Sequence, residues 1–346
     1  MMLSFFFLVS SFILPSHQQN SPLRALALLD TENDDAQVVA VVGVDPASGA
    51  VSQLGAKLPW STQAATSLDC ATAFAPASSG SARWLSIVGG GPSVASVDAT
   101  SGALLGLARL QPSFVIASVD WDARTGALMA VAQAAAGGVS LVSINATTGA
   151  VAVVSSLAGL PFPEACTSAL SLASGTLYTV GLDAANDDAD QTVDAFELAS
   201  GRRLASVAWP ARSVGAVGRP VAVPPAAGDA SDTLVLAWAA PEAGPDRPLR
   251  FLQLDVRTAA QRVLAELPPA FADTVIDAGG QSAQPPVRAA DGSFTLYAFA
   301  FDNPLDAQYL LQVGPITPGA AGPLANVSMT AIAATAGFLW SPVLLS

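Results

Sequence analysis

The sequence predicts an all-β protein folded as a single β-propeller. Three observations lead to this prediction: turn-like segments recur at similar spacings, short hydrophobic runs flank them, and a second series of turns is interleaved with the first. Tandem four-stranded antiparallel units of roughly 40–55 residues are typical of propeller blades. Hydrophobic residues make up 51% of the 346 residues and charged residues only 12%, which is enough apolar material for an extensive core. Because no linker or shift in composition divides the chain, we expect one domain.

The first series of turns has an acidic or amide residue at its start and, in most copies, glycine at its end. The clearest copies are Asp45-Pro-Ala-Ser-Gly49, Asp98-Ala-Thr-Ser-Gly102 and Asn145-Ala-Thr-Thr-Gly149, followed by weaker ones at Glu197–Gly201 and Asp255–Ala259. An Asp or Asn side chain accepts hydrogen bonds from backbone N–H groups just ahead of it, and glycine adopts the positive φ that closes a hairpin. Alternating runs such as GVSLVSIN and AVAVVSSL lie on either side, so each turn is predicted to join two strands.

The second series of turns lies between the copies of the first. Its members are Ser79-Gly80, Thr125-Gly126, Ser174-Gly175, Gly228-Asp229 and Asp291-Gly292. Each precedes a hydrophobic run, for example ALMAVA or TLVLAW. One repeat therefore holds four short strands, which we letter A to D in chain order.

The number of B strands predicts the number of blades. Hydrophobic B strands lie near Leu26, Trp84, Leu128, Leu177, Leu234 and Leu296, which indicates six four-stranded blades; seven is the alternative if residues 271–288 hide further strands. No A strand precedes Leu26, and the chain ends in the apolar segment TAIAATAGFLWSPVLLS. We expect this C-terminal strand to complete the first blade and close the ring, which removes an exposed edge. The alternative, the apolar tail of a lipid-anchor signal, would leave the first blade open.

The strand-then-DxxTG pattern resembles the repeats of quinoprotein-like and YVTN-type β-propellers over most of residues 24–336. This resemblance is to a repeat type, and it implies a propeller fold that hosts many functions. Quinoprotein dehydrogenase repeats carry a tryptophan a few residues after the glycine. Here Val51, Leu104 and Val151 follow the turns, and only Trp209 lies in a comparable region, so the pattern does not favour a quinone cofactor.

The N-terminus predicts a signal peptide over residues 1–17 and a propeller domain over residues 18–346. Leu3 to Leu14 is apolar except for serines, a length typical of a secretory segment and too short to span a bilayer. The alternative is a mis-started first strand. The sequons at Asn145 and Asn326 fit a secreted or extracellular surface glycoprotein. Cys70 and Cys166 would then either form a disulfide or remain as two buried thiols.

Two acidic clusters precede C strands, at residues 30–35 and 183–190. The second offers the hard oxygens that Ca²⁺ prefers, from Asp183, Asn186, Asp187, Asp188 and Asp190. It lacks the central glycine and final glutamate of an EF-hand loop. The two clusters belong to blades on opposite sides of a six-bladed ring, so they cannot share one ion. We expect solvated hairpin tips, with weak calcium binding as the alternative.

The chain contains a single histidine, His17, at the predicted cleavage boundary. Its position argues against Ser-His-Asp hydrolysis, histidine-ligated zinc and a histidine-activated cysteine nucleophile. Carboxylate chemistry remains, because two carboxylates are enough for glycoside hydrolysis. The candidate carboxylates, expected near the starts of A strands on the face that carries the long loops, are Asp69, Asp120, Asp122, Glu164, Asp273 and Asp277.

Composition restricts the classes of partner. The formal net charge is −13, with 14 basic residues against 27 acidic ones and no basic cluster, so nucleic acid binding is not expected. No segment predicts a transmembrane span, and no cofactor is expected, with calcium as the alternative. We predict a secreted or cell-surface propeller that acts as a non-catalytic binding scaffold for a protein or carbohydrate. The alternative is a histidine-independent extracellular hydrolase or lactonase that uses carboxylates and calcium.

Overall fold

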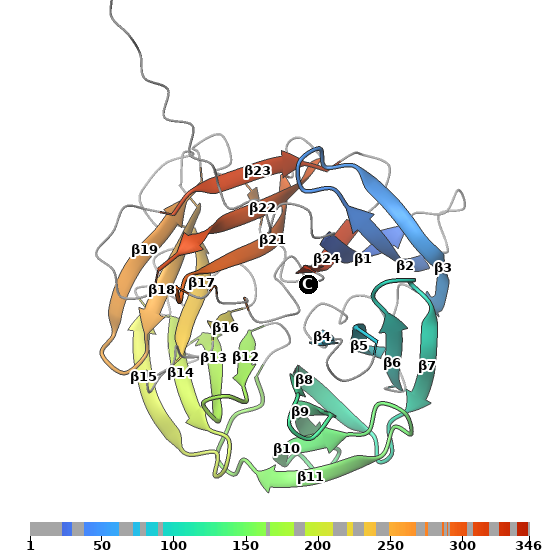
Figure 1. The fold of residues 1–346 in the computed structure, drawn as a ribbon. Coiled ribbons are helices and arrows are strands. Elements are labelled where there is room, and N and C mark those ends of the chain that lie inside the picture. Colours follow the sequence, from blue (N-terminus) through green and yellow to red (C-terminus); the bar gives the residue numbers. More distant parts are fainter. Residues whose placement is uncertain are drawn as a thin grey trace, which may run out of the picture.

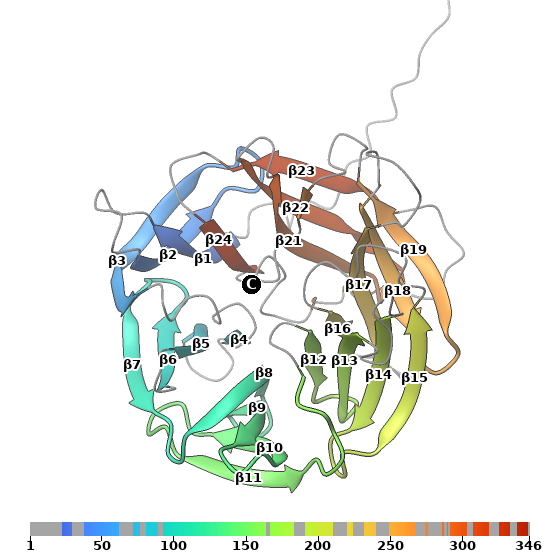
Figure 2. The ribbon, with the colours of Figure 1, turned by 180° about the vertical axis from the view of Figure 1, so that it is seen from behind.

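A computed structural model places the described residues in six four-stranded antiparallel sheets arranged as a ring (Figures 1 and 2). It describes residues 23–29, 38–61, 72–76, 81–88, 93–163, 167–182, 191–209, 220–223, 232–239, 249–267, 274–275, 286, 289, 291–302, 307–317, 325–332 and 338–344. The predicted six-bladed propeller is confirmed. In both views the first strand of a blade lies nearest the ring axis, and the fourth lies on the outer rim.

The strands follow one another in chain order, except in the first blade. The first blade consists of β24 (Phe338–Leu344), β1 (Leu23–Leu29), β2 (Val38–Val44) and β3 (Val51–Ser61). The second consists of β4 (Thr72–Ala75), β5 (Arg83–Val88), β6 (Ser93–Asp98) and β7 (Leu104–Arg109). The third consists of β8 (Phe114–Asp122), β9 (Ala127–Ala134), β10 (Val139–Ile144) and β11 (Val151–Ser156).

The other three blades continue the same pattern. The fourth consists of β12 (Ser168–Ser171), β13 (Thr176–Leu182), β14 (Gln191–Glu197) and β15 (Arg203–Trp209). The fifth consists of β16 (Val221–Val223), β17 (Thr233–Ala239), β18 (Leu249–Asp255) and β19 (Ala260–Glu266). The sixth consists of β20 (Thr274–Val275), β21 (Phe294–Asp302), β22 (Ala307–Ile316) and β23 (Val327–Ala331).

The C-terminal strand closes the ring, as predicted. β24 pairs with β1 in an antiparallel register that places Ala27 opposite Leu339. The side chain of Gln308, on β22 of the sixth blade, fixes this strand from the other side. Its Nε2 donates to the carbonyl of Leu339 at 2.7 Å, and its Oε1 accepts from the N–H of Leu339 at 3.0 Å. β24 is thus bonded both to the blade it completes and to the blade beside it.

The hydrophobic core lies between the blades. Each of the six clusters of buried side chains found among the described residues joins two neighbouring blades. In one, Val41 of β2 packs with the fully buried Trp84 of β5; in another, Met129 of β9 packs with Leu177 of β13. Alternate residues of a strand face opposite neighbours, so nearly every side chain of an inner strand is buried.

The first series of turns packs against the preceding blade. Gly102, with φ of 72°, lies so close to β3 that a Cβ atom there would stand 2.2 Å from the carbonyl oxygen of Leu54. The same approach occurs in the next blade, where a Cβ on Gly149 would lie 2.0 Å from the carbonyl oxygen of Arg109. Only glycine fits a position that combines positive φ with such an approach. The repeat motif therefore docks each blade on its neighbour.

Candidate functional site

A pocket lies at the seam between the third and fourth blades. It opens on the face that carries the β8–β9 and β10–β11 turns, which we call the turn face; the opposite face is the loop face. Its volume is about 730 Å³. Its apolar lining comes from Met129 of β9, Leu141 of β10, Val154 of β11, and Leu172 and Leu198 of the fourth blade. Asp122, Arg124, Thr125, Ser174 and Glu197 supply polar groups around this lining.

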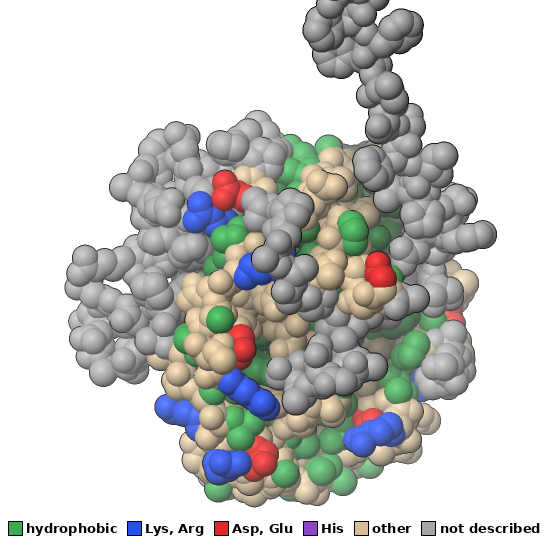
Figure 3. Space-filling model, turned by 60° about the vertical axis from the view of Figure 1, so that its left-hand side comes forward, with side chains coloured by type: hydrophobic (Ala, Val, Ile, Leu, Met, Phe, Trp, Pro, Cys, Tyr) green, Lys and Arg blue, Asp and Glu red, His purple; other side chains and the backbone are tan. Residues whose placement is uncertain are grey.

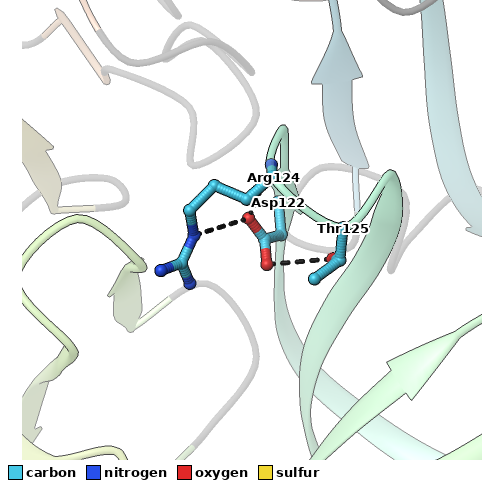
Figure 4. Close-up of polar contacts among 3 residues, drawn as sticks. All are labelled: Asp122, Arg124 and Thr125. Atoms are coloured by element: carbon cyan, nitrogen blue, oxygen red, sulfur yellow. Dashed lines mark hydrogen bonds and ion pairs between the residues drawn. The ribbon is translucent and has the colours of Figure 1, made fainter.

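On the side of the third blade, Asp122 organises the rim. It is the last residue of β8, and its own turn satisfies its carboxylate (Figure 4). Oδ1 accepts from the backbone N–H of Arg124 at 3.0 Å and from Nε of Arg124 at 3.3 Å, and Oδ2 accepts from the Thr125 hydroxyl at 2.9 Å. Burial raises the pKa of Asp122, but the hydrogen bonds from Arg124 and Thr125 and the positive charge of Arg124 outweigh it, and the pKa lies below its usual value. Asp122 therefore stays ionised and holds the base of the Arg124 guanidinium.

On the side of the fourth blade, the β14–β15 turn forms the rim. The Ser155 hydroxyl of β11 donates to the carbonyl of Leu198 at 2.7 Å and fixes the turn against the third blade. Glu197 accepts from the Ser200 hydroxyl at 2.5 Å and pairs with Nε of Arg202 at 3.7 Å. Both acidic residues of the rim are thus bonded within their own turns.

Ser174 connects the pocket to the fifth blade. Its hydroxyl donates to Oδ2 of Asp232, and the Tyr178 hydroxyl donates to the same oxygen at 2.9 Å. Burial raises the pKa of Tyr178, and the negative charge of Asp232 raises it further, so the phenol stays protonated. These bonds hold the wall of the pocket in place.

Two of the predicted carboxylates lie among the described residues. Asp120 and Asp122 were both expected near the start of an A strand on the loop face, and this placement is wrong: β8 runs towards the turn face, and Asp122 is its last residue. Asp120 lies two positions earlier on the same strand, where its Oδ1 accepts from the N–H of Trp121 at 2.8 Å. Within the described part of the chain, no group of three or more His, Cys, Asp or Glu residues could hold a metal ion.

Most of the other predicted site residues lie outside the described residues. These are the carboxylates Asp69, Glu164, Asp273 and Asp277, the calcium candidates Asp183, Asn186, Asp187, Asp188 and Asp190, and the cysteines Cys70 and Cys166. The strands that flank the two acidic clusters belong to the first and fourth blades, on opposite sides of the ring (Figure 1). Asn145 and Asn326 are described and exposed, and their glycosylation stays a prediction.

Sequence reasoning missed the pocket because its lining residues are apolar and far apart in the chain. One signal for it was present. Val153 and Val154 interrupt the alternation of β11 and both are exposed, at 59% and 56%. Consecutive exposed apolar residues on an outer strand indicate a bulge, and the β10–β11 register skips Val154.

No family model and no curated protein sequence matches the chain. Among solved structures, TolB from Acinetobacter baumannii is similar, with 9% identity, a TM-score of 0.52, and coverage of 95% of this chain and 67% of that one. A putative 6-phosphogluconolactonase from Bacteroides fragilis NCTC 9343 has 12% identity, a TM-score of 0.42, and coverage of 94% and 99%. A europium-containing methanol dehydrogenase has 13% identity, a TM-score of 0.33, and coverage of 85% and 63%.

At 9% identity the likeness to TolB is one of fold alone. It agrees with the propeller expected from the resemblance to quinoprotein-like repeats. Within the described part of the chain, no helix is long and apolar enough to cross a membrane. On the face shown in Figure 3, Lys and Arg side chains are scattered among Asp and Glu side chains and form no basic stripe. The described part of the chain is a six-bladed β-propeller.

Proposed function

We propose that the protein is a non-catalytic binding scaffold and that the pocket between the third and fourth blades is its ligand site. The chemistry of the pocket supports this function. An apolar lining surrounded by a few fixed polar groups is typical of ligand sites, where the apolar surface provides affinity and the polar groups provide orientation. The β14–β15 turn is bonded to the third blade, and the turn with Asp122 is closed by its own hydrogen bonds, so the site is formed before a ligand arrives.

The apolar lining of the pocket, with both rim carboxylates bonded within their own turns, is the observation that carries this proposal. In Asp98, Asp122 and Asp255 burial raises the pKa, but hydrogen bonds from the turn outweigh it and lower the pKa below its usual value. A catalytic acid needs the opposite, a pKa raised towards the working pH. Asp122 and its counterparts in the other turns therefore act as structural acceptors, which supports a binding role for the pocket.

We further propose that the protein acts outside the cell, with residues 1–17 as its signal peptide and glycans at Asn145 and Asn326. The support comes from the sequence and from the exposure of both asparagines. The Oδ1 of Asn145 accepts from the N–H groups of Thr147 and Thr148 at 2.9 and 3.0 Å. Since these bonds use the oxygen, a glycan on Nδ2 would be compatible with the turn. Mass spectrometry of the secreted protein would detect both glycans.

Binding and catalysis are separated by one comparison of three proteins. Chain 18–346, V154D and V153D would be applied to arrays of extracellular proteins and glycans and to a panel of lactone and glycoside substrates. We expect a ligand whose binding is lost in V154D and kept in V153D, with no turnover by any of the three. Turnover that disappears in the D122N/E197Q double variant would overturn the scaffold function.

A further inference from the structure

The seam between the fifth and sixth blades is built like the seam that forms the pocket. At both seams, the outer strand of the earlier blade pairs with the strand beside it in a register that skips one residue. The skipped residue lies at the same distance in sequence from the preceding turn. The skipped residues are Val154, between the pairs Leu141↔Ser155 and Val142↔Val153, and Leu264, between the pairs Phe251↔Ala265 and Leu252↔Val263. Val154 of the third blade and Leu264 of the fifth are therefore equivalent.

A comparable contact occurs at both seams, although the donors occupy different positions of the outer strand. The first residue after β14 is Leu198, and its carbonyl accepts from the Ser155 hydroxyl of β11 at 2.7 Å. The first residue after β22 is Thr317, and its carbonyl accepts from Nη1 of Arg262 of β19 at 3.3 Å. At each seam, a side chain of the earlier blade thus holds the start of the connection in the later blade.

The two seams differ in what covers the skipped residue. Leu264 is 2% exposed, and its carbonyl accepts from the N–H of Ala325 at 2.6 Å. Ala325 belongs to the long connection between β22 and β23. Val154 is 56% exposed, because the fourth blade has only the short turn from Glu197 to Gly201 at the equivalent place. The chain covers one seam with its own backbone and leaves the other as an open pocket.

From this comparison we propose that the pocket takes an extended, uncharged, apolar peptide segment of a partner protein, with one backbone N–H donating to the carbonyl of Val154. This proposal rests on the proposed scaffold function and names its ligand class. An extended segment that bonds to an outer strand is a common mode of peptide recognition, in which the backbone provides affinity and the side chains provide specificity. Ala325 shows that the equivalent carbonyl accepts such a bond.

The charges of the pocket favour an uncharged occupant. Asp122 is paired with Arg124 at 3.3 Å, and Glu197 with Arg202 at 3.7 Å, so neither carboxylate depends on a ligand for its partner. The connection that approaches Leu264 reads Thr-Pro-Gly-Ala-Ala-Gly-Pro-Leu-Ala over residues 317–325 and carries no charge. A charged group placed over Met129 and Leu141 would lose hydration without gaining a free partner.

The test uses displayed ten-residue peptides without charged residues, a library that includes the chain's own segment 317–326. Selected peptides are labelled and titrated into chain 18–346, V154D, V154T and V153D. Val153 is the matched control, since it is exposed on the same strand and does not line the pocket. We expect unchanged affinity for V153D, at least about a tenfold loss for V154D, and an intermediate loss for V154T.

Four results would overturn the peptide ligand. Failure to select any peptide would do so, and so would peptides that bind all four proteins equally; in the second case binding occurs elsewhere and the scaffold function stands. Binding of a glycan that depends on Val154 would support the site but show that its ligand is a glycan and not a peptide. Dimerisation of the chain that V154D abolishes and V153D does not would assign the pocket to a second copy.

Discussion

At the scale of single residues, the repeat motif has two separate structural roles. Its first residue closes the turn with its side chain, as when Oδ1 of Asp98 accepts from the N–H groups of Thr100 and Ser101 at 3.0 and 2.7 Å. Its glycine allows the turn to approach the preceding blade. The fifth blade has Ala259 at the glycine position, with φ of 57°, and this residue is exposed where Gly102 and Gly149 are buried.

Replacing Gly102 with alanine separates the cost of positive φ from the cost of close approach. We expect G102A to lower the free energy of unfolding by clearly more than about 1 kcal/mol, because the new Cβ would overlap the Leu54 carbonyl. G126A is the control, since Gly126 has a similar φ of 68° but open space around it. Urea unfolding of both variants measures the difference. Equal losses would show that close approach costs nothing.

Acid should weaken the turns. Since the pKa of Asp98 is lower in the folded protein than its usual value of 3.8, the carboxyl contributes stability that is fully present above that value. This contribution is lost as the pH falls through the folded pKa. Asparagine keeps the same turn at Asn145 and does not titrate. We therefore expect D98N to lose less stability than the parent below about pH 4. Thermal unfolding across this range measures it, and parallel profiles would contradict the assignment.

At the scale of elements, the blades, the turns and the closing strand follow from local rules that the sequence displays. Alternation and turn residues repeat, so the strand pairs that the turns at Asp98 and Asn145 join could be predicted from any one copy. The pocket could not be predicted in this way, because it depends on whether the connection in the next blade covers the seam. Val154 and Leu264 are both skipped by the register of their strand pair, yet Val154 is exposed and Leu264 is buried. Asp122 was misplaced because the end of β8, rather than its start, holds the acidic pair.

Ring closure should depend on Gln308. Replacing it with leucine leaves the N–H and carbonyl of Leu339 without their partners, and each lost partner of a buried group costs about 1–3 kcal/mol. We expect Q308L to unfold at lower temperature and to lose hydrogen-exchange protection in β1 and β24 first. Gln312, partly buried on the same strand, provides the control Q312L. Loss of protection elsewhere in the ring ahead of β24 would contradict this role.

At the scale of the whole molecule, six seams hold a ring together, and each seam is a place where a ligand could bind. The net charge of −13 disfavours binding to anionic polymers and anionic membranes, and it defines no site. The seam between the third and fourth blades differs from the one between the fifth and sixth because its cover is absent. The proposed ligand site therefore arises from a difference between repeats, the missing cover of one seam.

Calcium is expected to leave global stability unchanged. The acidic clusters lack the glycine and glutamate of a calcium loop, and solvated tips gain nothing from the ion. Thermal unfolding of chain 18–346 in millimolar Ca²⁺ and in EDTA tests this. A bound ion at a hundred times its dissociation constant would add about 2.7 kcal/mol. A clearly higher unfolding temperature in Ca²⁺ would contradict solvated tips and indicate a metal site.

The most direct test of the scaffold function is hydrogen exchange of chain 18–346 with and without the ligand selected on the arrays. We expect new protection from exchange at the backbone of β11 around Val154 and in the turns at residues 122–126 and 197–201. Exchange on the loop face should stay unchanged. Protection confined to the loop face, or to the rim of another blade pair, would contradict it.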